Sequence, residues 1–184
     1  SDKVAQRKQH DDEYDQDMLR QAIADTGRWA YGTISVEAWV FSPQTGNLTR
    51  PKRAFWFDPI AAQEGNEAMM RLVDDGRQDF VKPDPLAPGA GLPGALWSAL
   101  GRHNNRKIVW REVKPIANDP DQPYNLRLQL LAQAGIGLAA GVQFQFRGTQ
   151  GLVIYMARGK TDKAKLKSLT NEQYLLSATD VIGS

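Results

Sequence analysis

Apolar and polar residues alternate along residues 31–41, and this alternation predicts a β-strand with two different faces. One face is entirely apolar, and the other mixes aromatic, carboxylate and hydroxyl side chains. The apolar face consists of Ile34, Val36, Ala38 and Val40, and the mixed face of Ser35, Glu37, Trp39 and Phe41. We expect the apolar face to pack under helices, and the mixed face either to be half-exposed or to line a cavity.

The rest of the chain adds strands and amphipathic helices in an order typical of an α+β domain. A second strand at 48–57 returns after a turn and is interrupted by residues 50–53. Further strands are predicted at 107–113, 136–146 and 152–157, and helices at 10–26, 59–79, 124–134 and 162–182, with a short helix around Trp97. Two hairpins and few chances for parallel crossovers predict an antiparallel sheet.

Length and composition are those of one globular domain. The chain has 184 residues, of which 41% are hydrophobic, and no apolar run approaches the roughly 20 residues of a membrane span. We expect residues 1–9 to be a flexible tail and residues 10–184 to form a single domain. The absence of cysteine excludes disulfides, thiol catalysis and thioether-linked chromophores, and it fits an intracellular protein, cytoplasmic or nuclear.

The charges nearly balance, but they are not evenly distributed. The chain has 23 basic and 21 acidic residues, a net charge of +2, which predicts no general attraction to nucleic acid or anionic lipid and no membrane insertion. Residues 11–17 contain five acidic side chains, and residues 158–167 contain five basic ones. We interpret both runs as solvated surface.

A glycine-rich block at 89–99 contains the pattern Gly-x-Gly-x-x-Gly, which superficially matches a dinucleotide-binding fingerprint. The context argues against that function, because a proline-rich loop precedes the block instead of a strand and Pro93 lies inside it. The block is better interpreted as a turn that shapes the wall of a pocket and brings Trp97 to it. Two further blocks follow at 134–142 and 151–155.

These three blocks, in this order, resemble the GAF family of small-molecule sensor domains. The matching stretches are Gly-Leu-Pro-Gly-Ala-Leu-Trp at 91–97, Ala-Gly-Ile-Gly-Leu-Ala-Ala-Gly-Val at 134–142 and Gly-Leu-Val-Ile-Tyr at 151–155. The resemblance implies a six-stranded antiparallel sheet with the terminal helices on one face and a ligand pocket under loops and short helices on the other. A looser similarity connects the chain to the GAF-like N-terminal domain of plant basic helix-loop-helix regulators.

The sequence departs from several branches of that family, and the ligand therefore stays unknown. The Asn-Lys-x-x-Asp-Glu pattern of cyclic-nucleotide-binding GAF domains is absent, and without cysteine a covalently bound bilin is impossible. The two histidines, His10 and His103, are far apart in sequence, and we predict no metal site. His103 is interpreted as a turn residue, with a ligand contact as the alternative.

The pocket that the resemblance implies would be lined by aromatic residues with a few charged groups. The candidate ligand-contacting residues are Glu37, Trp39, Trp97, Trp110, Arg111, Glu112, Tyr124, Phe144 and Tyr155. An arginine entering the cavity would favour an anionic ligand. The alternative is that the rings fill a closed core and that the carboxylates occupy exposed or ion-paired strand positions.

The leading hypothesis is a non-catalytic sensor domain of a larger regulatory protein that binds a small molecule and signals through its terminal helices. Those helices lie together in GAF domains, so the resemblance also implies a homodimer. The alternative is a GAF-like protein-interaction or dimerisation module without a ligand. An enzyme with a mechanism that needs no thiol is the third possibility, although no triad or metal cluster is visible.

Overall fold

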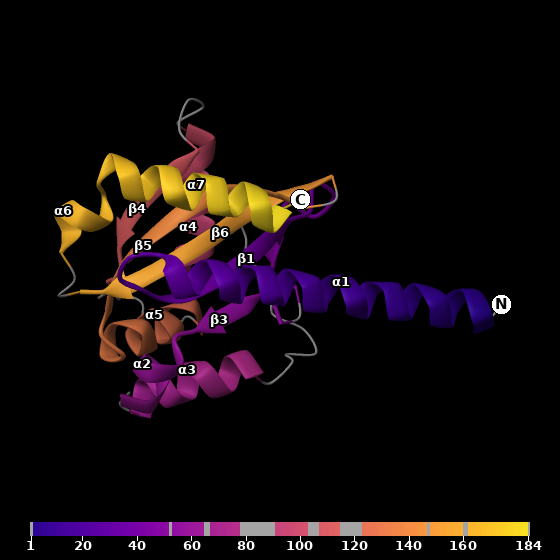
Figure 1. Cartoon of the computed structure of the whole chain (residues 1–184), viewed down its shortest axis with the longest axis horizontal. Helices are drawn as coiled ribbons and strands as arrows, with labels where there is room; N and C mark the ends of the chain where they lie inside the picture. The colour runs from indigo at the N-terminus through magenta and orange to yellow at the C-terminus, as the bar shows by residue number, and fades with distance from the viewer. Residues whose placement is uncertain are drawn as a thin grey trace.

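One antiparallel sheet organises the computed structural model, which describes residues 2–51, 53–64, 67–77, 91–102, 107–114, 123–146, 148–159 and 162–183. The sheet has six strands in these residues, in the order β2-β1-β6-β5-β4, with β3 also paired to β1 (Figure 1). The strands are β1 (Thr33–Phe41), β2 (Leu48–Thr49), β3 (Phe55–Phe57), β4 (Ile108–Glu112), β5 (Ile136–Phe146) and β6 (Thr149–Arg158). The predicted six-stranded α+β sheet is confirmed.

The two terminal helices cover one face of the sheet. They are α1 (Asp2–Trp29) and α7 (Leu169–Gly183), with the short α6 (Lys163–Leu166) before α7. Leu19 and Ile23 of α1 and Leu175 of α7 are buried together with Val36 of β1 and Phe144 of β5. The Tyr174 hydroxyl of α7 also donates to the Thr26 carbonyl oxygen of α1, at 3.4 Å.

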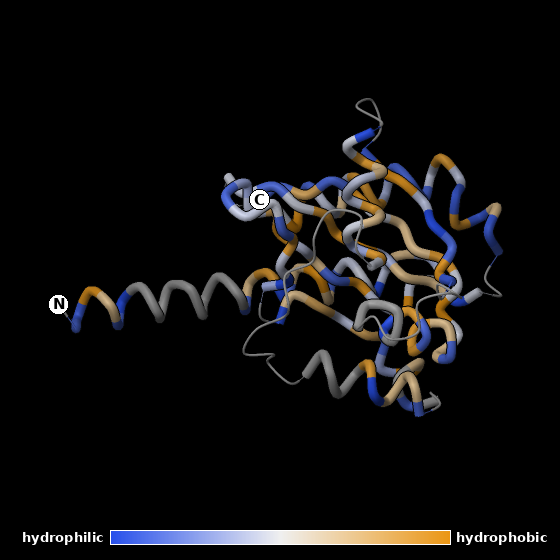
Figure 2. The backbone as a smooth tube through the Cα atoms, turned by 180° about the vertical axis from the view of Figure 1, so that it is seen from behind, coloured by the Kyte–Doolittle hydropathy of each residue, from blue (hydrophilic) through white to orange (hydrophobic). Residues whose placement is uncertain are grey.

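The first half of α1 projects beyond the sheet (Figure 1). Residues 2–9, predicted from the sequence as a tail, form the first turns of this helix. In Figure 2 the hydrophobic positions concentrate in the body of the molecule, where the sheet and the second half of α1 lie. No described helix is both long enough and apolar enough to span a bilayer.

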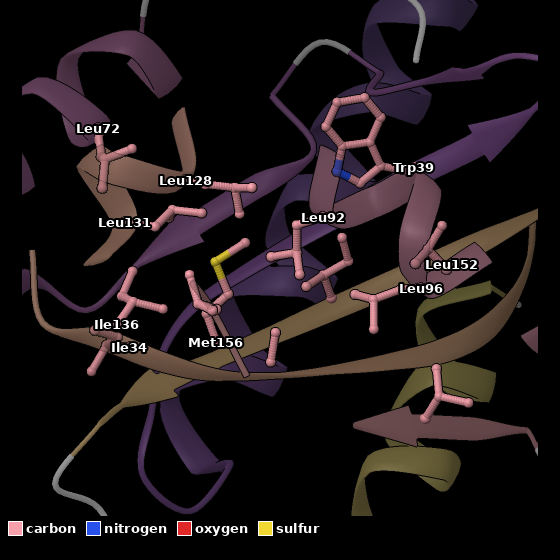
Figure 3. Close-up of a cluster of buried hydrophobic side chains, with 14 of the residues drawn as sticks. Ile34, Trp39, Leu72, Leu92, Leu96, Leu128, Leu131, Ile136, Leu152 and Met156 are labelled. Carbon is pink, nitrogen blue, oxygen red and sulfur yellow. The ribbon is translucent and has the colours of Figure 1, made fainter. Parts of the chain in front are cut away.

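Four helices pack on the opposite face: α2 (Pro59–Glu64), α3 (Glu67–Arg77), α4 (Gly91–Arg102) and α5 (Pro123–Gln133). Figure 3 shows Leu92 and Leu96 of α4 and Leu128 and Leu131 of α5 pointing at the sheet, where they are buried against residues such as Ile154. The single helix predicted at 59–79 is therefore two helices. The proline-rich loop that precedes the glycine-rich block lies outside the described residues, as does His103.

The two faces of β1 differ as the alternation predicts. Val36 and Ala38 pack in the layer of α1 and α7, whereas Trp39 packs in the layer of α4 and α5. Ile34 is the exception, because it joins the layer of α4 and α5. A shift in register between Thr33 and Ser35, where β1 pairs with β6, changes the alternation at this end of the strand.

Two glycines have backbone angles that explain where helices begin and end. Gly135, two residues after the last residue of α5, has φ of 86°, the conformation that favours glycine at a helix end. Gly91 has φ of 62° where α4 begins. The short helix predicted around Trp97 is confirmed as α4, which also includes residues 91–94 of the predicted turn, and residues 89 and 90 lie outside the described residues.

Candidate functional site

A carboxylate lies buried in the middle of the sheet, on the face covered by α4 and α5. Glu37 occupies the centre of β1, where its backbone pairs with Phe55 of β3 on one side and Ile154 of β6 on the other. Its side chain is 2% exposed. An isolated charge in such a place would be very costly, so the residues around it decide whether it can be ionised.

Two arginines from distant parts of the chain contact the Glu37 carboxylate. The Arg50 Nη1 lies 3.3 Å from Glu37 Oε2, and the Arg127 Nη2 lies 2.8 Å from the same oxygen. Arg50 follows β2, is 10% exposed, and its guanidinium also stands 5.3 Å from the centre of the Phe55 ring. Arg127 comes from α5 and is 35% exposed, so its guanidinium reaches solvent.

The pKa of Glu37 lies below the usual value of a glutamate. Burial alone would raise this pKa, but the charges of Arg127 and then Arg50, with smaller contributions from the Trp39 indole and the Arg127 hydrogen bond, outweigh it. Glu37 is therefore an ionised carboxylate in the protein interior. Buried groups with shifted pKa values gather at functional sites, although structural ion pairs show them too.

Two polar atoms next to this ion pair lack a hydrogen bond among the described residues. They are Glu37 Oε1 and the indole Nε1 of Trp39, both buried. The indole N–H is near enough to the carboxylate to help lower its pKa, yet the two groups fall short of hydrogen-bond geometry. Native proteins leave few such atoms unsatisfied, because each costs about 1–3 kcal/mol.

Aromatic rings extend the site along β1 towards α4. Phe41 stacks on Trp97 with ring centres 5.0 Å apart and planes inclined by 28°. Trp97 is half-buried and packs against the same apolar layer as Trp39. Three of the nine candidate residues, Glu37, Trp39 and Trp97, thus lie on the predicted face. Their contact with a ligand stays a prediction.

The structure places three other candidates on the opposite face, under the terminal helices. Phe144 and Tyr155 are buried there, and Trp110 is half-buried beside them. The Tyr155 hydroxyl lies 2.9 Å from Thr179 Oγ1, and the Trp110 indole donates to Glu172 Oε1 at 2.7 Å. These rings attach α7 to the sheet because their strand positions point away from α4 and α5.

The last three candidates are separate from the Glu37 cluster. Arg111 is exposed. Glu112 is exposed as well and is bridged by Lys114 Nζ at 2.7 Å and Lys163 Nζ at 3.2 Å, which agrees with the alternative of an ion-paired strand position. Tyr124 lies in α5, but its side chain is outside the described part of the chain.

Sequence reasoning missed both arginines that hold Glu37. They lie 13 and 90 residues from it in the chain. A glutamate on a strand that is buried on both faces requires a cationic partner, and that requirement is a usable signal. It does not identify which of the 23 lysines and arginines pairs with Glu37.

Metal chemistry finds no support in the part of the chain that the structure describes. No group of three or more histidine, aspartate or glutamate side chains gathers there in a way that could hold an ion. The Glu37 cluster has a single carboxylate between two guanidinium groups, and such a surrounding repels a cation. Its chemistry is that of hydrogen bonding and charge recognition.

Comparison of the structures identifies the fold. The GAF domain of a two-component sensor histidine kinase from Bacillus halodurans matches with a TM-score of 0.52 and 15% sequence identity, over 91% of each chain. This chain has the GAF fold. The resemblance found in the sequence is confirmed at that level, and the similarity to plant basic helix-loop-helix regulators stays a prediction. No family model matches the sequence, and no curated protein matches it significantly.

Two further structures match over nearly the whole chain with lower TM-scores. The PixJ GAF domain of Thermosynechococcus elongatus, in its blue-light absorbing form, has a TM-score of 0.45 and 8% identity over 93% of this chain and 86% of its own. The inducer-binding domain of the Acinetobacter transcription factor PobR, a double mutant in complex with 3-hydroxybenzoic acid, has a TM-score of 0.41 and 11% identity over 94% of this chain and 97% of its own. With both TM-scores below 0.5, nothing about this chain is concluded from them.

Proposed function

We propose that this chain is a non-catalytic regulatory domain that binds a small molecule between the sheet and the helices α4 and α5. The observation that carries the proposal is the Glu37 cluster, a buried ion pair beside the Trp39 indole, whose N–H lies near the carboxylate without forming a hydrogen bond of good geometry. A buried ion pair is seldom the most stable solution for a core, so its presence fits a binding role. The GAF fold is consistent with that role.

The cluster also gives the ligand a route to the rest of the domain. Arg127 is the partly exposed member, so a molecule entering from solvent meets its guanidinium first. A ligand that satisfies Glu37 Oε1 and the Trp39 N–H changes the contact between β1 and α5. The other face of β1 carries Val36 and Ala38, which pack against α1 and α7, the helices that we infer to carry the signal onward.

A thermal-shift screen tests this function. Nucleotides, tetrapyrroles and common metabolites are each added to the chain, and native mass spectrometry checks the stoichiometry of any hit. A ligand at 100 times its Kd adds about 2.7 kcal/mol to the free energy of unfolding, which is a clear shift. The hit is then tested on Trp39→Phe, which removes the indole N–H but keeps an aromatic ring.

A matched variant makes the screen decisive. Trp97→Phe changes a ring on the same face whose role is stacking on Phe41. We expect Trp39→Phe to weaken ligand binding more than Trp97→Phe does. If the ligand binds Trp39→Phe and Glu37→Gln with the same affinity as the unchanged protein, its site lies elsewhere and the proposal is wrong.

A second function is favoured by a separate observation on the terminal helices. Several large apolar side chains are exposed there, namely Met18 and Trp29 of α1 and Leu169 and Val181 of α7. We propose as the alternative a protein-interaction module, with a homodimer through α1 and α7 as its simplest form and an intracellular location, cytoplasmic or nuclear. Light scattering at rising concentration tests the dimer, and a strictly monomeric chain would contradict it.

A further inference from the structure

Aromatic and basic side chains meet at the end of the molecule where α1 ends and α6 begins. We call this end of the molecule the basic pole and define it by five exposed residues of the segments that meet there, namely Trp29, Tyr31, Lys165, Lys167 and Leu169. Lys165 Nζ stands 4.5 Å from the centre of the Tyr31 ring, so the turn between α1 and β1 and the helix α6 are in contact (Figure 1).

The apolar members of the pole are unusually open to solvent. Trp29 is 78% exposed and Leu169 is 71% exposed. A tryptophan offers one of the largest apolar surfaces of any side chain, and at the end of α1 nearly all of it faces water. Single exposed apolar residues need no explanation, but a tryptophan, a tyrosine and a leucine beside two lysines form a mixed surface that does.

The lysines of the pole keep their charge available. Among the described residues, neither Lys165 nor Lys167 has a carboxylate partner. The acidic side chains closest to these lysines in the chain keep their negative charge but have other hydrogen-bond partners: Asp162 accepts from the backbone N–H of residues 164 and 165, and Glu172 accepts from the Trp110 indole. Glu112 pairs with two lysines at once.

The net charge of +2 is a sum over the whole chain, and part of the negative charge lies in the acidic run at 11–17, in the middle of α1. Asp17, the last residue of that run, is 12 residues before Trp29 on one continuous helix. At 1.5 Å per residue the two are about 18 Å apart. The screening length in physiological salt is about 8 Å, so the acidic run does little to cancel the field of the pole.

The composition of the pole distinguishes between anionic partners. Lysine is depleted at protein–protein interfaces, whereas tryptophan and tyrosine beside lysine are typical of the boundary between a bilayer and water. A single-stranded nucleic acid needs a track of open rings for stacking. Here Lys165 covers the Tyr31 ring, and Lys167 stands 6.0 Å from the half-buried Trp110 ring, which leaves Trp29 alone.

We propose that the basic pole binds the surface of an anionic bilayer, with Trp29 at the level of the headgroups and Lys165 and Lys167 against the lipid phosphates and carboxylates. The contact is peripheral and needs no spanning segment. It does not involve the proposed small-molecule site at Glu37 and Trp39, under α4 and α5.

Vesicle binding by the whole chain tests the proposal. Vesicles of phosphatidylcholine with 30% phosphatidylserine are compared with vesicles of phosphatidylcholine alone, at low and at physiological salt. We expect binding to the anionic vesicles only, weakened by salt, with a blue shift of tryptophan fluorescence that Trp29→Phe abolishes. Each lysine near an anionic surface contributes about a fivefold change in partitioning, so Lys165→Ala with Lys167→Ala lowers it about 25-fold.

The matched control removes the same charge from the far end of the molecule. Lys3 and Arg7 are exposed on the projecting half of α1, and replacing both with alanine should leave vesicle binding unchanged. Equal losses in the two double variants would overturn the proposal, as would no binding to anionic vesicles at low salt. Binding to oligo-dT or to polyglutamate in place of the vesicles would also overturn it.

Discussion

The Arg127 guanidinium of α5 donates to the Glu37 carboxylate of β1 at 2.8 Å, and this contact joins residues 90 positions apart in the sequence. It links the central sheet to a helix of the layer that carries the candidate site. Because Arg127 is partly exposed and Glu37 is not, the two partners should respond differently to substitution.

Replacing each arginine by alanine should show the effect of burial on an ion pair. We expect Arg50→Ala to cost about 3 kcal/mol of unfolding free energy and Arg127→Ala about 1–2 kcal/mol, because water partly solvates the Arg127 guanidinium. Arg53→Ala is the control, since its pair with Asp17 is exposed and should contribute below about 1 kcal/mol. Urea denaturation measures all three, and equal losses would contradict the assigned burial.

Acid should weaken the fold partly through Glu37. Its pKa in the folded protein is below the ordinary 4.5, so its ionisation stabilises the fold fully above that value. The contribution is lost as pH falls from about 4.5 through the lower folded pKa. Unfolding free energy measured between pH 6 and pH 3 should therefore fall less steeply in Glu37→Gln than in the unchanged protein, and parallel curves would refute this linkage.

The Tyr155 hydroxyl should help to hold α7 on the sheet. It is buried and lies 2.9 Å from Thr179 Oγ1, which itself donates to the Leu175 carbonyl oxygen at 2.7 Å. Tyr155→Phe should cost about 1 kcal/mol, because one buried hydrogen bond is lost while the threonine keeps its other partner. Tyr174→Phe, which removes a longer and partly exposed hydrogen bond, should cost less in the same thermal denaturation assay.

Two glycines should respond to alanine with opposite signs. A Cβ on Gly27 of α1 would lie 2.3 Å from the Trp56 ring of β3, so Gly27→Ala should destabilise by about 1–3 kcal/mol. A Cβ on Gly101 of α4 would meet nothing within 4 Å, and Gly101→Ala should stabilise by up to about 1 kcal/mol through helix propensity. Thermal denaturation measures both changes in stability. A Gly27→Ala variant as stable as the unchanged protein would mean that α1 is not in close contact with β3.

The sequence predicted the sheet well because its strands alternate clearly. Val36 and Ala38 were expected under helices, and they pack under α1 and α7. The position of Ile34 could not be predicted, since it depends on a register shift between two strands that are far apart in the chain. The boundaries of the predicted helices differ from the observed ones mainly at 59–79, where the structure has the two helices α2 and α3.

The candidate site was predicted less completely, for a physical reason. Alternation separates the two faces of a strand but does not say which face meets which helices, so Phe144 and Tyr155 were grouped with Trp39 although they lie on the opposite face. Glu37 was found because a carboxylate interrupts an apolar strand. Its arginine partners depend on tertiary packing, which no local pattern records.

The projecting half of α1 has a mechanical consequence. The helix is held on the sheet near Leu19 and Ile23, and about 26 Å of it extends from Leu19 back to Asp2 at 1.5 Å per residue. A tilt of about 10° at the held end would therefore displace the far end by roughly 4–5 Å over that length. A rigid helix that pivots in this way would turn a small repacking under the sheet into a displacement larger than a hydrogen bond can span.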